Sequence, residues 1–269
     1  MKDQISIIGC GWLGFPLAKA LINEGFSIKG STTSMDKLST LKSNGIDPFL
    51  IELDEDKLIG NYSKFLQGST TIIINIPPGL RKSPNKNHSA ELIHLINAIE
   101  KSSIKNVLFI SSISVYQDDF NFSKITEDLL PNTNSNNGKQ LIEIEESLRE
   151  NAKFKTTILR FGGLFDDKRH PAKYLSGKTN IANPEAPINL IHKQDCIEII
   201  AMLLRKNTWN ISINATYPAH PTKKGYYSEY CLKADLALPK FNKAKKSKGK
   251  IIDSSILVQN LKYTFKQAP

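Results

Sequence analysis

The feature that most constrains the fold is a short apolar strand that runs directly into a glycine-rich turn and then into a helix. Residues 5–8 are Ile-Ser-Ile-Ile, and Gly9-Cys10-Gly11-Trp12-Leu13-Gly14 follows at once. Apolar residues then recur at helical spacing as far as Ile22, and Gly25 ends that pattern. A strand before the motif and a helix after it are the context that the dinucleotide-binding G-x-G-x-x-G fingerprint requires.

Each glycine of this motif has its own physical reason. The first forms a tight turn, the second lets the backbone approach a pyrophosphate, and the third lets the helix pack against the strand. The helix N-terminus adds amide donors and a positive dipole. A glycine-rich turn without a ligand is the alternative. We predict that the loop binds a dinucleotide through Gly9, Gly11, Trp12, Leu13 and Gly14.

Strand and helix patterns alternate along the first 160 residues. Further strands are predicted at 26–29, 48–53, 70–76, 106–110 and 156–160, and helices at 35–43, 88–102 and 138–151. This alternation indicates βαβ units and therefore an α/β fold, a Rossmann-type doubly wound parallel sheet.

Beyond residue 161 the pattern loosens. Gly, Pro and Asn become frequent, one helix is predicted at 193–204, and a late strand at 209–214. We predict an NAD(P)-binding Rossmann domain at 1–160 and a smaller, C-terminal substrate-binding lobe at 161–269, interleaved with the core, because ligands of such sheets bind outside the carboxyl ends of the strands.

The end of the second predicted strand indicates which dinucleotide binds. NAD enzymes usually carry an acidic residue there, whereas this chain has Ser31-Thr32-Thr33-Ser34 and then Lys37. Hydroxyls and a nearby cation suit a 2′-phosphate, although Ser and Thr also cap helices. We predict NADP, with NAD as the alternative cofactor. Asp54 is a candidate acceptor for the adenine amino group or a plain turn residue.

The segment Ser111-Ser112-Ile113-Ser114-Val115-Tyr116 follows the strand predicted at 106–110. With the glycine motif, Asn75-Ile76-Pro77-Pro78, and the segments 159–163 and 189–197, it resembles the extended short-chain dehydrogenase/reductases, the family of sugar-nucleotide epimerases and dehydratases. Three shorter segments resemble an atypical bacterial subgroup known only as epimerase/dehydratase-like: 12–14, 169–171 and 248–251.

The resemblance implies roles for individual residues. Asn75, Ile76, Pro77 and Ser111 would contact the cofactor, and Ser112 would orient a substrate carbonyl or alcohol beside the nicotinamide; a hydroxyl that only caps the end of the strand is the alternative for Ser112. The family's catalytic pair is Tyr-x-x-x-Lys. Here Lys139 begins the corresponding helix, yet Ser135 stands four residues earlier. Lys139 then binds ribose or is a surface lysine. Predicted substrate residues are Ser114, Tyr116, Arg160, Arg169, His170, Asn189 and His192; for a lone His a structural role is the alternative.

Composition limits the partners. The net charge is +10, but only five of the 36 basic residues are Arg, the preferred reader of phosphates and bases. We predict no nucleic-acid partner, and we interpret the lysines of 240–250 as a solvated loop. Three scattered Cys without C-x-x-C spacing favour a reducing compartment and no zinc site. No apolar run reaches the ~18 residues of a membrane span, and the N-terminus lacks a signal-like region. We expect a cytoplasmic protein without membrane or metal.

Three function classes follow. The first is an NAD(P)-dependent oxidoreductase, epimerase/dehydratase-like, acting on a small polar substrate such as a nucleotide sugar, with a degenerate Tyr-x-x-x-Lys site. The second is a non-catalytic NADP-binding sensor or regulatory protein. The third, an RNA-associated protein, lacks the interleaved basic and aromatic residues that single-strand binding needs. We expect a monomer or a homodimer in which the helices 88–102 and 138–151 pair.

Overall fold

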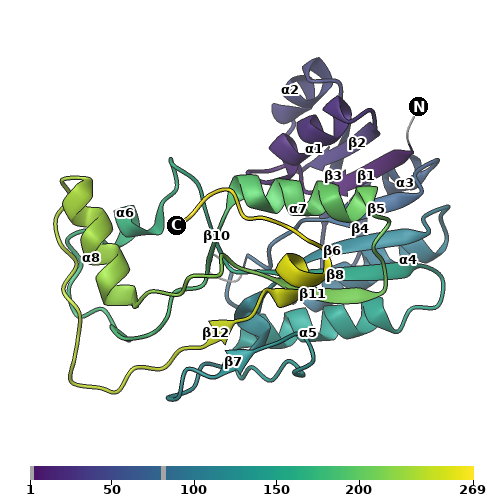
Figure 1. Ribbon diagram of the computed structural model, residues 1–269. Coiled ribbons are helices and arrows are strands. Elements are labelled where there is room, and N and C mark those ends of the chain that lie inside the picture. The colour runs from purple at the N-terminus through teal and green to yellow at the C-terminus, as the bar shows by residue number, and fades with distance from the viewer. Residues whose placement is uncertain (1–2, 80–82) are drawn as a thin grey trace. The chain divides into compact units, whose positions relative to one another are not determined.

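Eight strands form one sheet in the computed structural model, which describes residues 3–79 and 83–269 (Figure 1). Their order across the sheet is β11-β8-β6-β5-β1-β2-β3-β4. The pairs that β1 forms with β2 and β5 are parallel, as are β2 with β3 and β5 with β6, whereas β3 and β4 are antiparallel. The strands of the sheet are β1 (Gln4–Ile8), β2 (Ser27–Thr32), β3 (Asp47–Leu53), β4 (Leu58–Gly60), β5 (Thr71–Ile74), β6 (Asn106–Ser112), β8 (Lys155–Phe161) and β11 (Ile211–Ala215).

Helices cover both faces of this sheet. In Figure 1, α1 and α2 lie on one face, and α4 and α5 lie side by side on the other. The central strands are buried on both faces, so they are runs of isoleucine without polar alternation, as in Ile72–Ile74. The helices are α1 (Gly14–Asn23), α2 (Lys37–Ser43), α3 (Tyr62–Leu66), α4 (His88–Glu100), α5 (Asn136–Arg149), α6 (Pro171–Leu175), α7 (Lys193–Arg205) and α8 (Lys223–Lys233). The predicted α/β class and mostly parallel sheet are confirmed.

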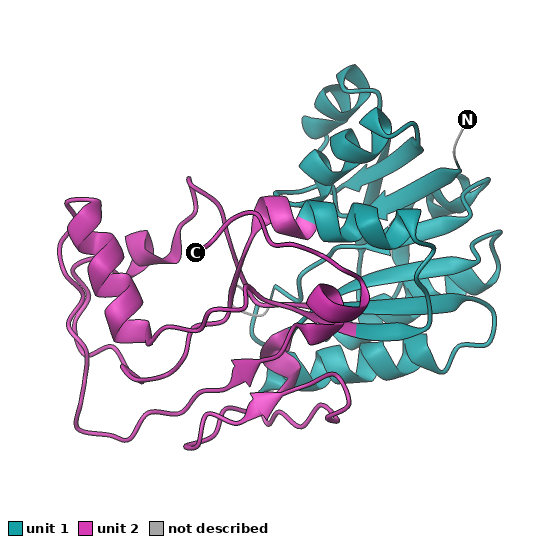
Figure 2. Ribbon diagram, in the orientation of Figure 1, with its two compact units in different colours: residues 1–112, 135–159, 197–212 teal, residues 113–134, 160–196, 213–269 magenta. Residues whose placement is uncertain are grey.

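Backbone contacts divide the chain into two units, coloured separately in Figure 2. Unit 1 comprises residues 1–112, 135–159 and 197–212; unit 2 comprises 113–134, 160–196 and 213–269. The domain boundary predicted at residue 160 stays a prediction, because units defined by contacts exchange the segments 113–134 and 197–212.

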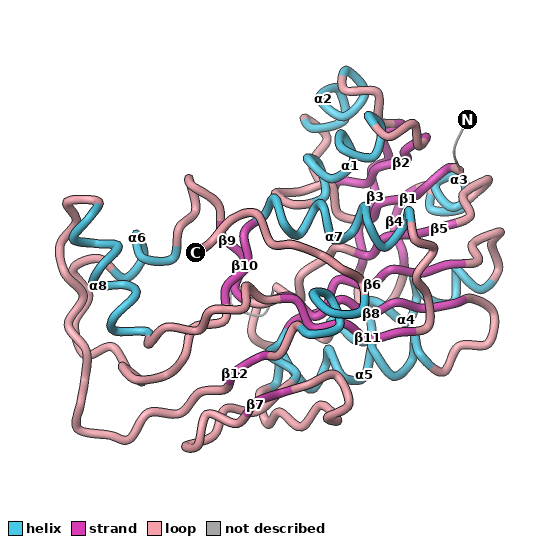
Figure 3. The backbone as a smooth tube through the Cα atoms, in the orientation of Figure 1, coloured by secondary structure: helices cyan, strands magenta, loops and turns pink. Residues whose placement is uncertain are grey.

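Unit 2 consists largely of loops held by short parallel strand pairs (Figure 3). β9 (Gly163–Phe165) pairs with β10 (Leu190–His192), and β7 (Lys124–Ile125) pairs with β12 (Ile251–Ile252). Side chains of α6, α8, β9 and β10, together with Ile188, form a small core of Phe165, Ala172, Ile188, Leu190, Tyr227 and Cys231.

The sequence pattern predicted one helix beyond residue 161, and α6 and α8 were missed. α8 buries only Tyr227 and Cys231, so it lacks the wide apolar stripe from which a helix is predicted. α6 has five residues, too few for a periodic pattern. Its start is set instead by Pro171 at the first helical position, where the missing N–H costs nothing.

Candidate functional site

The glycine loop, residues 9–14, connects β1 to α1. Gly9 has φ +98°, and a Cβ there would lie 2.3 Å from the carbonyl oxygen of Asn75. A Cβ on Gly14 would lie 2.2 Å from the carbonyl oxygen of Gly9. Both contacts are with backbone atoms, which cannot swing aside. These two positions therefore accept only glycine, and they bring the start of α1 close to the carboxyl ends of β1 and β5.

Gly11 differs from its two neighbours in the motif. Among residues 3–79 and 83–269, no atom lies within 4 Å of a Cβ placed at Gly11, so these residues leave the space in front of it open. The residue before α1, Leu13, provides no side-chain cap, and no acidic side chain lies in the first turn of the helix. Open space at the second glycine and an uncapped helix N-terminus fit the pyrophosphate of a dinucleotide.

Two polar side chains hold the glycine loop in place. Asn75 donates from Nδ2 to the Gly9 carbonyl at 3.0 Å, and the Ser31 hydroxyl accepts from the Gly9 N–H at 3.0 Å. Ser31 is only 2% exposed, and its carbonyl accepts from the Cys10 N–H at 2.8 Å. Ser31, which was predicted to contact a phosphate, therefore stabilises the conformation of the glycine loop.

The other residues predicted to determine the cofactor preference lie at the end of β2, at the start of α2 and just after β3. Thr32 is buried and accepts from the Ser34 N–H at 3.1 Å, whereas Thr33 is exposed and Ser34 is half-buried. Lys37, at the start of α2, is exposed. Asp54 is exposed after β3, and its carboxylate accepts from the Asp56 N–H at 3.1 Å, as in an ordinary Asx turn.

The serines that end β6 differ in environment. The Ser111 hydroxyl donates to Oε1 of Glu145 at 2.6 Å, and both side chains are buried. This bond joins β6 to α5. Ser112 is half-buried at the last position of the strand. Ile76 is half-buried and Pro77 exposed just beyond β5, on the strand next to β6 in the sheet.

The start of α5 explains what Ser135 does. Ser135 is the N-cap, with extended backbone (φ −74°, ψ 141°), and its hydroxyl accepts from the Gly138 N–H at 3.2 Å. Lys139 lies in the first turn and is exposed. The side of the helix that is buried carries Gly138, Leu141 and Glu145 instead. The serine that stands four residues before Lys139 is thus a helix cap.

In unit 2, Tyr116 and Arg160 belong to one buried network. Arg160 is 1% exposed and donates to the Tyr116 hydroxyl at 2.5 Å. That hydroxyl donates in turn to Oδ1 of Asn214 at 3.3 Å. A guanidinium that is buried and paired in this way fixes the position of the ring it contacts. Ser114 lies two residues before Tyr116 in the short 3₁₀ helix Ile113–Val115, and it is half-buried.

The remaining predicted substrate residues are spread along unit 2. Asn189 holds β12 in place through two hydrogen bonds: its Nδ2 donates to the Lys250 carbonyl, and its Oδ1 accepts from the Ile252 N–H. His192 packs edge-on against Phe165 at 5.1 Å between ring centroids. Arg169 is exposed.

Hydrogen bonds and ring contacts hold His170 in place. Its Nδ1 accepts from the Ala172 N–H at 3.2 Å, so Nε2 carries the hydrogen and donates to the Tyr226 hydroxyl at 2.7 Å. The imidazole also stacks on Tyr230, with ring centroids 3.6 Å apart. Both tyrosines belong to α8, and because that helix was not predicted, neither was recognised from the sequence.

Acidification is expected to destabilise the protein through His170. Burial, with a smaller effect of Lys173, lowers the pKa of His170 from 6.5 to about 4. In the unfolded chain it titrates near 6.5, so between these values only the unfolded state gains the proton. The free energy of unfolding should therefore fall as the pH drops from 6.5 to 4, by about 2 kcal/mol.

Urea unfolding of the wild type and of His170→Asn at pH 7 and pH 4.5 measures this loss. Asn is a good helix cap but does not titrate, so the variant should lose less stability on acidification. Burial also lowers the pKa values of His88 and His220, which leaves the variant some pH dependence of the same sign. An equal loss in both proteins would contradict the assignment.

Asp195, in the segment 189–197 that resembles the extended short-chain dehydrogenase/reductases, binds residues near the end of the chain. It is fully buried, and its Oδ1 accepts from the Tyr263 hydroxyl at 2.6 Å and from the Lys266 N–H at 2.9 Å. Its Oδ2 accepts from the Gln267 N–H at 3.1 Å. This carboxylate has a structural task that the sequence pattern did not reveal.

Comparison with known proteins agrees with the glycine loop and the sheet. A model of the NAD(P)H-binding family matches residues 9–193. Protein YeeZ of Escherichia coli K12 is 31% identical over 265 residues, which cover 97% of this chain and 95% of that protein. Among the described residues, no helix is long and apolar enough to cross a membrane.

Solved structures share the fold at low sequence identity. UDP-glucose 4-epimerase from Thermotoga maritima superposes with a TM-score of 0.80 at 14% identity, covering 98% of this chain and 94% of that one. UDP-glucuronic acid 4-epimerase from Bacillus cereus gives a TM-score of 0.78 at 19% identity over the same shares. The chain therefore belongs to the NAD(P)H-binding family, and its fold is that of the extended short-chain dehydrogenase/reductases and nucleotide-sugar epimerases.

Proposed function

We propose that the protein is an NADP-dependent oxidoreductase of the epimerase/dehydratase type, acting on a small polar substrate such as a nucleotide sugar. The observation that carries this proposal is the open space at Gly11, next to the uncapped start of α1. Two proteins of the same fold support the substrate class: the solved structures of MoeE5 and of the Thermotoga maritima epimerase both contain UDP-glucose.

The choice of NADP rests on the end of β2. Ser31 and Thr32 are occupied with backbone contacts, which leaves exposed Thr33, half-buried Ser34 and exposed Lys37 to receive a 2′-phosphate. Residues 31–34 carry no carboxylate that would repel a phosphate or accept from a free 2′-hydroxyl; the first one after them along the chain is Asp36, the residue before α2. MoeE5 and the Bacillus cereus epimerase hold NAD, so this preference would set the chain apart from them.

A comparison of NADPH with NADH tests this preference. Tryptophan fluorescence should show NADPH binding several-fold tighter to the wild type, since Trp12 lies in the glycine loop. Ser34→Asp should remove that preference by repelling the 2′-phosphate. Ser63→Asp adds the same charge at an exposed position of α3 and should leave it unchanged. Equal affinities in the wild type, or a preference for NADH, would overturn the assignment.

The chemistry would depend on few residues. The bound nicotinamide would supply the hydride acceptor or donor. Ser112, at the end of β6, would orient the substrate by a hydrogen bond from its hydroxyl, and Lys139, exposed in the first turn of α5, would contact the nicotinamide ribose. Ser135 is used as a helix cap, and an aliphatic hydroxyl lacks the acidity of a phenol. We therefore propose slow or narrowly specific turnover.

Unit 2 would supply the substrate contacts. We retain Ser114, Arg169, Asn189 and His192 as proposed contacts, and we assign Tyr116, Arg160 and His170 a supporting part because they are buried and hydrogen-bonded to neighbours.

One observation favours a second candidate function, a non-catalytic NADP-binding sensor or regulator. In the first two turns of α5 the buried residues are Gly138 and Leu141, which carry no polar side chain, while Lys139 is exposed.

For either function we propose a cytoplasmic protein, monomeric or homodimeric through α4 and α5, without a nucleic-acid partner. Its three cysteines are all free, which suits a reducing compartment.

A further inference from the structure

The lysine loop, residues 240–250 of unit 2, is firmly held by its backbone. Near one end, the Lys240 carbonyl accepts from the Ile181 N–H at 3.1 Å, and at the other Gly249 exchanges two hydrogen bonds of 2.9 Å with Asp119. Between them the buried Ser247 hydroxyl accepts from the Glu185 N–H at 3.1 Å. The segment interpreted from sequence as a solvated loop is therefore fixed at both ends and in the middle.

The lysines of this loop have two different environments. Lys250 is buried, and its Nζ donates to Asp118 at 2.8 Å and to the Tyr116 carbonyl at 2.7 Å. Lys245, Lys246 and Lys248 are exposed. None of the ion pairs found among the described residues includes these three. Three lysine side chains thus lie within four residues and form no ion pair with the described residues, so the local potential is positive and attracts anions.

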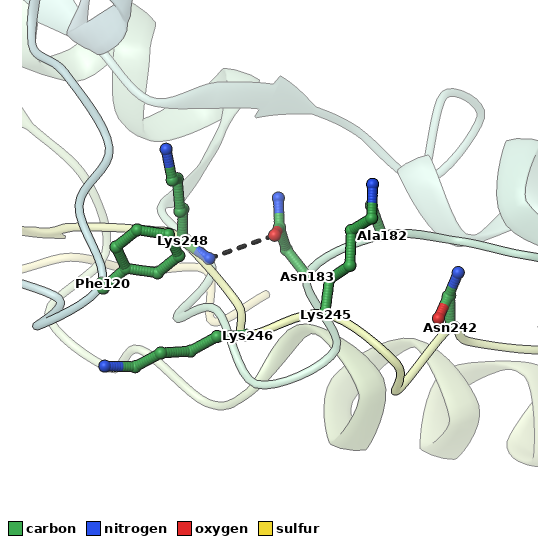
Figure 4. A pocket seen from close by; sticks show the side chains of 7 residues that line it. All are labelled: Phe120, Ala182, Asn183, Asn242, Lys245, Lys246 and Lys248. Atoms are coloured by element: carbon green, nitrogen blue, oxygen red, sulfur yellow. Dashed lines mark hydrogen bonds between the residues drawn. The ribbon is translucent and has the colours of Figure 1, made fainter.

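These lysines border a cavity of about 460 Å³, which also includes Phe120 and Asn183. In Figure 4 the side chains of Lys245 and Lys248 point to the same side as the Asn183 amide, whereas Lys246 points away. The Lys248 ammonium lies 4.6 Å from the centre of the Phe120 ring, a cation–π contact that restrains the side chain.

Asn183 adds a directed donor. Its Oδ1 accepts from the backbone N–H of Lys248 at 3.1 Å, and in Figure 4 its Nδ2 points to the same side as the Lys245 and Lys248 side chains. Its φ of +58° is a left-handed conformation that Asn tolerates better than most residues. A neutral donor between two ammonium groups suits a tetrahedral oxyanion, which accepts several hydrogen bonds at once.

We infer that this cavity is a binding site for a phosphorylated small molecule, with Lys245, Lys248 and the Asn183 amide as its phosphate ligands. The volume is that of a small-molecule pocket, whereas nucleic acid needs a basic groove along which a strand can extend. The site lies entirely in unit 2 and does not depend on the dinucleotide proposed for the glycine loop.

Titration with inorganic pyrophosphate, followed by NMR and calorimetry, tests the site in the full-length protein. The side-chain amide signals of Asn183 should shift on binding. Lys245→Ala/Lys248→Ala and Asn183→Asp should each weaken pyrophosphate binding at this site by about tenfold or more. Lys240→Ala/Lys243→Ala removes the same charge from exposed positions that do not line the cavity, and should change affinity by about twofold or less.

Two results would overturn the inference. An equal loss of pyrophosphate affinity in the two double variants would mean general attraction to a basic surface. The site would instead belong to nucleic acid if the protein bound an oligonucleotide more tightly than pyrophosphate and lost that binding in Lys245→Ala/Lys248→Ala. NADPH affinity of the Lys245→Ala/Lys248→Ala variant, measured in parallel, should equal that of the wild type. A protein that binds pyrophosphate here but no NADPH would refute the proposed function and leave this site standing.

Discussion

Replacing Gly11 with valine is expected to abolish dinucleotide binding and to leave the stability of the protein almost unchanged. In the free protein the new side chain would enter space that the described residues leave open, since none of their atoms lies within 4 Å of a Cβ at Gly11, and the backbone is not left-handed there. The same side chain would fill the position where a pyrophosphate must approach the backbone. NADPH titration and thermal unfolding of the variant measure the two effects.

Gly14→Val is the matched control. The added Cβ would lie 2.2 Å from the Gly9 carbonyl oxygen, so β1 and α1 must separate. We expect a loss of about 3 kcal/mol or more in the free energy of unfolding, at the upper end of what overpacking costs. If Gly11→Val bound NADPH like the wild type, the glycine loop would not be the pyrophosphate site.

Ser112→Ala is expected to lower NADPH-dependent turnover about a hundredfold, the usual effect of removing one positioned hydrogen-bond donor from an active site. The substrate is sought first among nucleotide sugars. Lys139→Met should instead weaken NADPH affinity, by about tenfold, because it removes one charged donor to the ribose. Steady-state kinetics and cofactor titration separate the two effects.

Lys101→Met, at an exposed lysine just beyond α4, is the control for a lost surface charge and should alter neither quantity. If both Ser112→Ala and Lys139→Met kept full activity, the chemistry would not take place at the end of β6, and the sensor function would be the better account. Ser135→Tyr should not raise activity and should destabilise the protein by about 1 kcal/mol, because it removes the N-cap of α5.

The sheet could be predicted because its strands are buried on both faces. A run such as Ile72–Ile74 gives the same signal wherever it occurs, and the helices between the strands are long enough to show their period. The elements that were missed are short or polar: β4 has three residues, α3 five, and α8 buries two side chains. Tertiary contacts, and not local pattern, determine such elements.

The candidate site was predictable in part, for a related reason. Gly9, Gly11 and Gly14 lie within six residues, so their spacing can be recognised from the sequence alone. The partners of buried polar groups are not local: Ser31 bonds to Gly9, and Asp195 bonds to residues near the end of the chain. A hydroxyl that shapes a loop and one that faces a ligand look the same in sequence. The lysine loop is a further case, because only the structure separates buried Lys250, which pairs with Asp118, from exposed Lys245 and Lys248, which form no ion pair with the described residues.

The most direct test of the central claim is a crystal structure of the protein grown with saturating NADPH. We predict that the pyrophosphate lies over Gly11, against the amides at the start of α1, with the 2′-phosphate beside Thr33, Ser34 and Lys37. A structure in which the dinucleotide is absent from the glycine loop, although NADPH is present at concentrations that saturate its relatives, would contradict the account.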